Sequence, residues 1–159
     1  MAELMRPKDA VSAKLGCVYV TIEGRRELWA NVKNIEANAD ISSADVPRVG
    51  TLVTGSKVTG ISYSGKMTIY KVHSAVDDMV QQMADTGIIP YFDVQTVSED
   101  PTANSGRDVK LLFDCHLDGT IKIAGLDSDG EFQEQEVGFR AAGCKPLEKF
   151  SNTTSIIAG

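Results

Sequence analysis

Apolar and polar residues alternate along most of this chain, and a period of two is typical of β-strands that bury one face. The first run, residues 15–22, places Val18, Val20 and Ile22 on one face. Glu23-Gly24 then supplies a turn. About seven or eight strands are expected, the others at residues 27–35, 49–53, 57–72, 91–97, 109–116, 120–126 and 131–141. Short strands at this spacing predict a mainly β fold, an antiparallel β-sandwich or barrel.

One segment has the period of a helix instead. Its apolar residues fall at i, i+3, i+4, i+7 and i+8, and they are Val76, Met79, Val80, Met83 and Ala84. Ser74 is a suitable N-cap, with Asp77 three positions later. Gly87 fits the position after the last helical turn, and Pro90 prevents continuation. The sequence therefore predicts one flanking α-helix over about residues 74–86.

Length, charge and cysteine usage narrow the class of protein. A chain of 159 residues fits one domain. Sixteen Lys and Arg against 22 Asp and Glu give a formal net charge of −6, which disfavours a nucleic-acid-binding domain because phosphate contacts need clustered cations. No apolar run reaches the roughly 20 residues of a membrane span, so no membrane anchor is expected. Three cysteines, with no apolar secretory segment at the N-terminus, predict reduced thiols in a protein made in the cytoplasm.

Motifs of catalytic or cofactor chemistry are incomplete. Residues 60–66, GISYSGK, match a phosphate-binding loop. Met67 stands where a Ser or Thr would hold magnesium, however, and the next residues alternate like a strand. Cys115 and His116 are adjacent, but on a strand they would point to opposite faces and so would not share a metal. No catalytic, cofactor or metal site is therefore expected, and the chain is predicted not to be an enzyme.

Extended segments favour a protein that assembles. Residues 1–13 and 144–159 are expected to be N- and C-terminal arms of a domain spanning residues 14–143. Residues 36–60 are expected to form an extended, weakly amphipathic hairpin, and such extensions often bury themselves on a neighbouring chain. The alternative is a flexible surface loop. Glycines recur every five residues in this region and are expected to allow close strand packing: Gly50, Gly55, Gly60 and Gly65.

Seven segments in fixed order resemble one protein family. They are NIEANADISSADVPRVG (34–50), VTGSKVTG (53–60), GKMTIYKVHS (65–74), PYFDVQTVSED (90–100), SGRDVKLLFDC (105–115), IKIAGLDSDG (121–130) and EQEVGF with KPLEKF (134–150). Over roughly residues 14–150 the chain resembles the tail tube proteins of contractile phage tails and tail-derived bacteriocins, of the XkdM-like kind found in defective prophages. The resemblance implies two antiparallel sheets packed as a sandwich or small barrel with one helix on the flank.

The resemblance also implies a structural function. Six subunits would form a ring, and rings would stack helically into a hollow tube inside a contractile sheath. The implied partners are further copies of the chain, the tail sheath protein, the baseplate hub or tube initiator, the tape-measure protein, and DNA in transit. The chain would be made in the bacterial cytoplasm and assembled into a virion or tail-like particle.

Two sets of residues are expected to serve the tube. The assembly set lies in or beside the 36–60 hairpin, with Ile35, Ile41, Val46 and Val49 as apolar anchors and Asp45, Arg48 and Lys57 as ion-pairing groups. The lumen-facing set consists of carboxylates on polar strand faces: Glu27, Asp93, Asp108, Asp118 and Glu134. Six copies carry 6 × −6 = −36 formal charges, and charge of this sign facing the lumen would repel DNA and let it slide.

Three other functions compete with a phage tail tube. The first is the inner tube of a type VI-like secretion or injection device, which neighbouring sheath and tape-measure genes would distinguish. The second is a monomeric β-sandwich module that binds a small molecule in an apolar pocket. The third is a hydrolase, which would need a clustered acid–base site that the sequence does not display.

Overall fold

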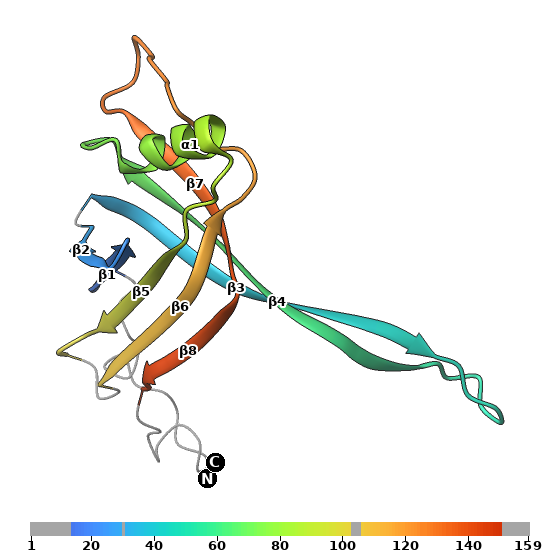
Figure 1. Ribbon diagram of the computed structural model, residues 1–159. Helices are drawn as coiled ribbons and strands as arrows, with labels where there is room; N and C mark the ends of the chain where they lie inside the picture. Colours follow the sequence, from blue (N-terminus) through green and yellow to red (C-terminus); the bar gives the residue numbers. More distant parts are fainter. Residues whose placement is uncertain (1–13, 30, 103–105, 151–159) are drawn as a thin grey trace.

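A computed structural model describes residues 14–29, 31–102 and 106–150. Within these ranges the chain forms eight strands and one helix, and the predicted mainly β fold is confirmed (Figure 1). The elements are β1 (Gly16–Ile22), β2 (Arg25–Leu28), β3 (Val32–Val46), β4 (Gly55–Tyr70), α1 (Ala75–Thr86), β5 (Phe92–Glu99), β6 (Arg107–Leu117), β7 (Glu134–Ala141) and β8 (Gly143–Glu148).

The strands form one antiparallel sheet that folds over into two layers. Its order is β2-β1-β5-β6-β7-β4-β3, and β8 pairs with β6 beside this path. The fold-over occurs at β6, which pairs with β8 along most of its length and with β7 only at His116 and Leu117. One layer is therefore β2-β1-β5-β6-β8 and the other is β3-β4-β7 (Figure 1).

The core lies between these two layers and under α1. Buried side chains of the first layer, such as Val20 and Val94, face buried side chains of the second, such as Met67 and Ile69. The rings of Phe92 and Phe139 meet edge to face with centroids 6.1 Å apart, a favoured aromatic geometry. The helix contributes Val76 and Met79, two members of its predicted apolar stripe.

The local signals at the turn and at the helix end are confirmed. Glu23 and Gly24 both have positive φ, 51° and 79°, which is the two-residue turn that matches the twist of a hairpin. Gly87 has φ 72° and donates its N–H to the carbonyl of Met83. Ser74 occupies the N-cap position but makes no side-chain capping hydrogen bond.

The structure corrects four strand assignments. Residues 27–35 are not one strand, because β2 ends at Leu28 and buried Trp29 separates it from β3. Residues 49–53 lie in the tip of the long hairpin, and residues 120–126 lie in a loop between β6 and β7. Residues 144–148, expected in a C-terminal arm, instead form most of β8 and pair with β6. The expected N-terminal arm and residues 151–159 lie outside the described residues.

Candidate assembly surfaces

The long hairpin of β3 and β4 projects from the two-layered body. Its arms have 15 and 16 residues. β7 pairs with β4 only from Tyr63 to Tyr70, so beyond Ser62 the arms have only each other as strand partners within the described chain. Figure 1 shows this outer part extending far from the core. The segment expected to form an extended hairpin, residues 36–60, lies within this β3–β4 pairing.

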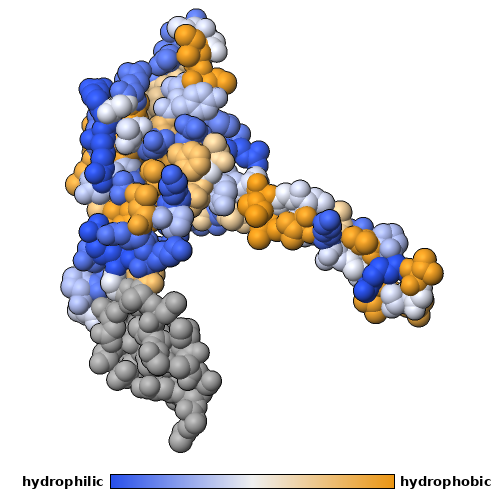
Figure 2. All heavy atoms as spheres, turned by 60° about the horizontal axis from the view of Figure 1, so that its bottom comes forward, coloured by the Kyte–Doolittle hydropathy of each residue, from blue (hydrophilic) through white to orange (hydrophobic). Residues whose placement is uncertain are grey.

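One face of this hairpin is apolar and exposed. The register pairs Ile35 with Met67, Ala39 with Tyr63, and Ile41 with Ile61, all on the face that continues into the core. A bulge then brings Val58 opposite Ser43 on the same face. The exposed fractions of Ile41, Ile61 and Val58 are 62%, 58% and 54%. Figure 2 shows apolar atoms along the projecting arm.

The opposite face of the hairpin is polar. Glu36 lies opposite Lys66, and Asn38 lies opposite Ser64. The hydroxyl of Ser64 donates to the Asp40 carboxylate at 2.8 Å. The hairpin is therefore amphipathic across its two faces, with apolar and polar side chains alternating along each arm as a two-faced strand requires.

The tip of the hairpin joins the last pair, Val46 and Gly55, through residues 47–54. Val49 and Leu52 are fully exposed there. The Arg48 guanidinium turns back onto the tip, where Nη2 donates to the carbonyl of Val53 at 3.1 Å. The tip therefore presents bare apolar side chains on a turn that has hydrogen bonds of its own.

The structure groups only part of the expected assembly set. Ile35 and Ile41 share the apolar face, whereas Val46 follows five positions after Ile41 and lies on the opposite face. Asp45 and Lys57 also lie on opposite faces, because Lys57 pairs with Ala44. The sequence reasoning did not name five exposed or partly exposed apolar residues of the outer hairpin: Leu52, Val53, Val58, Ile61 and Tyr63. The cross-strand register places Val58, Ile61 and Tyr63 on the apolar face, and the tip beyond the last strand pair holds the others.

The five expected lumen carboxylates do not share one surface. The register places Asp93 on the outer face of the first layer, beside Thr21, and Glu27 and Asp108 on the face that holds Val20. Asp118 follows the end of β6 and is exposed. Glu134 begins β7 on the polar face of the second layer. Their role in a lumen stays a prediction.

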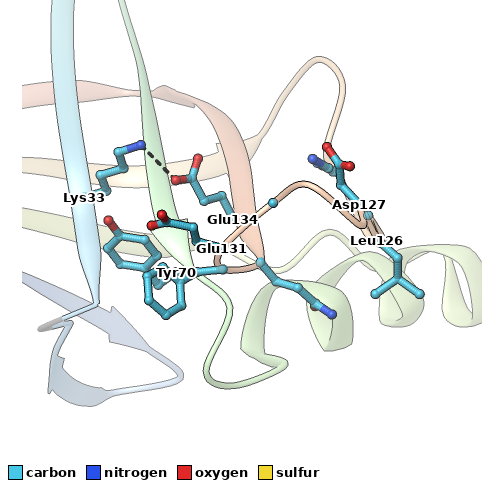
Figure 3. Close-up of a pocket in the computed structure, with 11 residues that line it drawn as sticks. Lys33, Tyr70, Leu126, Asp127, Glu131 and Glu134 are labelled. Atoms are coloured by element: carbon cyan, nitrogen blue, oxygen red, sulfur yellow. Dashed lines mark hydrogen bonds and ion pairs between the residues drawn. The ribbon is translucent and has the colours of Figure 1, made fainter.

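Two open hollows flank the root of the hairpin. One, of about 460 Å³, is lined by apolar groups such as Ile35, Tyr63 and Leu112 together with Lys110. The other, of about 820 Å³, lies between the hairpin root and the 118–133 loop, and Leu126 and Asp127 of that loop are part of its lining (Figure 3).

The root of the hairpin is tied to β7 at the second hollow. Lys33 Nζ donates to the Glu134 carboxylate at 2.8 Å, as drawn in Figure 3. The hydrogen bond and the charge of Glu134 raise the pKa of Lys33. Both side chains are substantially exposed, and exposed pairs of this kind contribute little to stability. The Tyr70 and Phe132 rings meet edge to face at 6.1 Å.

Chemistry-bearing side chains are scattered. No group of three His, Cys, Asp or Glu residues suited to a metal occurs among the described residues. Cys115 is buried, and burial raises the pKa of its thiol to about 12, so it is a neutral packing group and not a nucleophile. In the part of the chain that the structure describes, no helix is long and apolar enough to cross a membrane.

Among the described strands, three lie at an edge of the sheet. β2 and β8 end the first layer, and β3 ends the second. In the part of the chain that the structure describes, the 15 residues of β3 pair with β4 alone, and the outer part of β3 has neither an interior proline nor a bulge of its own to block pairing. Unprotected edges of this length are templates for strands of another chain.

Comparison with known proteins gives a consistent result. A family model described as "Phage tail tube protein" matches residues 3–148. The phage-like element PBSX protein XkdM of Bacillus subtilis (strain 168) is 33% identical over 149 residues, which cover 94% of this chain and 98% of that protein.

Solved structures show the same fold at low sequence identity. The chain resembles one in the sheath–tube complex of an extracellular contractile injection system, PVC, in its extended state. The TM-score is 0.67 at 8% identity, with 89% of this chain and 93% of that chain covered. It also resembles the SPP1 tail tube, with a TM-score of 0.60 at 11% identity, covering 91% of this chain and 82% of that chain.

Proposed function

Because this chain belongs to the phage tail tube protein family, we propose that it works as hexameric rings that stack helically into a hollow tube inside a contractile sheath. It is a structural subunit of a tail tube. The observation that carries the proposal is the β3–β4 hairpin, which exposes an apolar face that its own body does not cover.

The apolar face is the first reason to expect self-association. Ile41, Ile61 and Val58 lie beyond the strand that supports the hairpin root. A large exposed apolar surface is unfavourable in water and marks an interaction site. In a tube every subunit has identical neighbours, so the same hairpin is covered at each position when it lies on an adjacent copy.

The open edges are the second reason. Among the described strands, β3 ends the second layer, and β2 and β8 end the first. When edges of successive copies join, the sheet continues around a ring and few free edges remain. Obligate assemblies of this kind bury about 2,000–5,000 Å² or more per interface.

The lumen is the third element of the proposal. The outer face of β3, β4 and β7 is polar and carries charges of both signs: Glu36, Asp40, Glu134 and Glu136 with Lys33, Lys57, Lys66 and Arg140. We place this face toward the lumen, which retains Glu134 from the five expected carboxylates. A ring of six carries −36 formal charges, from six chains of −6 each. A wall without clustered cations limits the binding of DNA during passage, because phosphate contacts need them.

Partners and cargo follow from the same assembly. We propose that the tail sheath protein surrounds the tube, that the baseplate hub or tube initiator starts it, and that the tape-measure protein occupies it before DNA. The likeness to an extracellular contractile injection system supports a second candidate, a tube that delivers protein cargo. The nucleic-acid content of purified particles distinguishes the two.

The test is electron microscopy of the purified protein over a range of concentrations, together with particles induced from the source cells. Hollow tubes or six-fold rings are the expected result. A chain that stays monomeric at high concentration, and that is missing from any tail-like particle, would overturn the proposal and favour a monomeric ligand-binding module.

A further inference from the structure

The tip of the hairpin exposes apolar side chains, and its backbone is nevertheless ordered by hydrogen bonds within the tip. Eight residues, Pro47 to Thr54, connect the last strand pair. A connection of this length has many conformations when unbraced, and each residue ordered on docking costs conformational entropy. A tip that docks on a neighbouring copy therefore gains affinity when it is ordered beforehand.

Arg48 supplies this order through contacts within its own chain. Its Nη2 donates to the carbonyl of Val53 at 3.1 Å, across the tip. The guanidinium also lies over Gly55, where an added Cβ would be 3.5 Å from Nε. The Val53 N–H donates to the Thr51 hydroxyl at 3.1 Å, so Val53 is held through both of its backbone groups.

The braced turn directs two apolar side chains outward. Gly50 has φ +89°, a conformation that side-chain-bearing residues rarely adopt, and it follows Val49 at the turn. Val49 and Leu52 are both fully exposed. The charged group of the tip thus points back to the backbone while the apolar groups point to solvent.

We propose that Arg48 is a positioning residue for tube assembly, which holds the tip so that Val49 and Leu52 are presented to a second copy of the chain. The proposal rests on the proposed function. It replaces the expectation that Arg48 forms an ion pair across subunits. Arg48 acts here through the shape of the tip, and Val49 and Leu52 make the contact.

The two roles of Arg48 differ in their response to salt. A hydrogen bond to a neutral carbonyl inside one chain changes little with ionic strength. An exposed ion pair between subunits weakens as salt screens it. The effect of removing Arg48 on assembly is therefore expected to be the same at about 0.05 M and about 0.5 M salt, where the Debye lengths differ by about threefold.

The experiment measures the critical concentration for assembly by sedimentation. Four variants are compared with the wild type: Arg48→Ala, the double variant Val49→Ser with Leu52→Ser, the triple combination, and Lys57→Ala as a control that removes the same charge nearby. Arg48→Ala is expected to raise the critical concentration about fivefold, the worth of one hydrogen bond. The triple variant should have the same critical concentration as the double variant, because the contact that Arg48 positions is already absent there.

A second measurement follows the hydrogen bond between Arg48 and Val53 directly. Hydrogen exchange of the tip amides, above all Val53, is compared in the dilute, unassembled wild type and Arg48→Ala. Exchange is expected to be faster in the variant and unchanged in Lys57→Ala. Because the tip is outside the core, all variants should keep the unfolding temperature of the wild type.

Four results would overturn the proposal. Equal, salt-sensitive effects of Arg48→Ala and Lys57→Ala would show that charge alone matters. An additive effect in the triple variant would show that Arg48 contacts the neighbour itself. Equal hydrogen-exchange rates of the tip amides in the wild type and Arg48→Ala would show that Arg48 does not order the tip. A wild type that assembles while the Val49 and Leu52 variant assembles equally well would also overturn it. Failure of the proposed function is distinct from all of these, since then the wild type itself would stay monomeric at every concentration.

Discussion

At the scale of single residues, a polar chain of contacts ties α1 to the sheet. Gln135, with 1% of its surface exposed, donates from Nε2 to the Asp77 carboxylate at 2.8 Å. The other oxygen of Asp77 lies 2.8 Å from Lys71 Nζ, which also donates to the carbonyl of Ile123. The sequence indicated Asp77 as a capping residue, but its carboxylate instead joins β7 and the end of β4.

This contact gives a stability prediction. Asp77→Ala leaves the buried amide of Gln135 without its acceptor, which should lower the free energy of unfolding by about 1–3 kcal/mol. Asp78→Ala is the matched control, because Asp78 is an exposed acid in the same helical turn. Urea unfolding of the two variants checks the difference, and equal losses would contradict the role given to Asp77.

Glycines at equal spacing have unequal roles. A Cβ at Gly65 would lie 2.5 Å from Phe139 Cζ and 2.8 Å from the Glu36 carbonyl oxygen, whereas one at Gly60 would meet nothing within 4 Å. Gly65→Ala should therefore cost about 1–3 kcal/mol through overpacking, and Gly60→Ala far less. Thermal unfolding compares them. The expectation of close packing holds at Gly65, and it is wrong at Gly60.

Cys115 makes stability depend on alkaline pH. Burial raises the pKa of its thiol from 9.0 to about 12, so the folded chain keeps a proton that the unfolded chain loses first. This contribution to stability is complete below pH 9 and decreases as the pH rises toward 12. Cys115→Val removes the titrating group and should flatten this decrease. Unfolding by urea at several alkaline pH values tests it, and parallel curves for the two proteins would contradict it.

At the scale of elements, the two faces of the long hairpin could be predicted from the sequence, but the pairing of its residues across the strands could not. The alternation of β3 and β4 predicted a two-faced extension, because strand periodicity is local. The partner of each residue depends on the register and on a bulge between Ser42 and Ser43, which no local signal specifies. Val46 is a different case, because it lies five positions after Ile41 on one regular strand and the period of two alone places it on the opposite face.

The prediction of a strand over residues 120–126, in the loop after β6, was wrong for a related reason. Ile121 and Ile123 alternate with polar residues as strand residues do, but in the described structure no strand pairs with them. Ile121 packs against the core and Ile123 is exposed. The helix and the two-residue turn were predictable because capping, glycine and period act within a few residues.

The two faces of the hairpin yield a sharp test of assembly. Ile41→Asp places a carboxylate on the apolar face, and a charge buried at an interface without a partner is costly. We expect the critical concentration for assembly to rise at least about tenfold. Ser42→Asp adds the same charge to the adjacent residue, which faces the polar side, and should have a much smaller effect. Light scattering against concentration checks both, and an Ile41→Asp chain that assembles normally would contradict the interface.

At the scale of the whole molecule, the body and the outer hairpin are separable. The buried core uses Met67 and Ile69 of β4, and the core with the residues packed against it takes nothing between Ile35 and Met67. Folding therefore depends on the root of the hairpin, and assembly is assigned to the rest. This division was not readable from composition, because the same alternation runs through both parts of each strand.

A shortened chain tests this division. Replacing residues 41–61 with Asn-Gly joins Asp40 to Ser62, a facing pair, through a turn that suits a two-residue hairpin. The product is expected to fold, to unfold near the wild-type temperature, and to remain monomeric at every concentration. Circular dichroism and size-exclusion chromatography check this. Tubes from the shortened chain, or loss of its fold, would contradict the separation.

The pairing of β4 with β7 also determines how the molecule bears force. Eight facing pairs, from Tyr63 to Tyr70, attach the hairpin root to the strand that leads into the fold-over at β6. A pull on the hairpin along its length acts parallel to these strands, so the hydrogen bonds of the ladder are loaded together in shear and are not opened one after another. The hairpin is thus anchored by a ladder of hydrogen bonds that must all break together. A tube built from such subunits is expected to resist tension applied along the length of the hairpin.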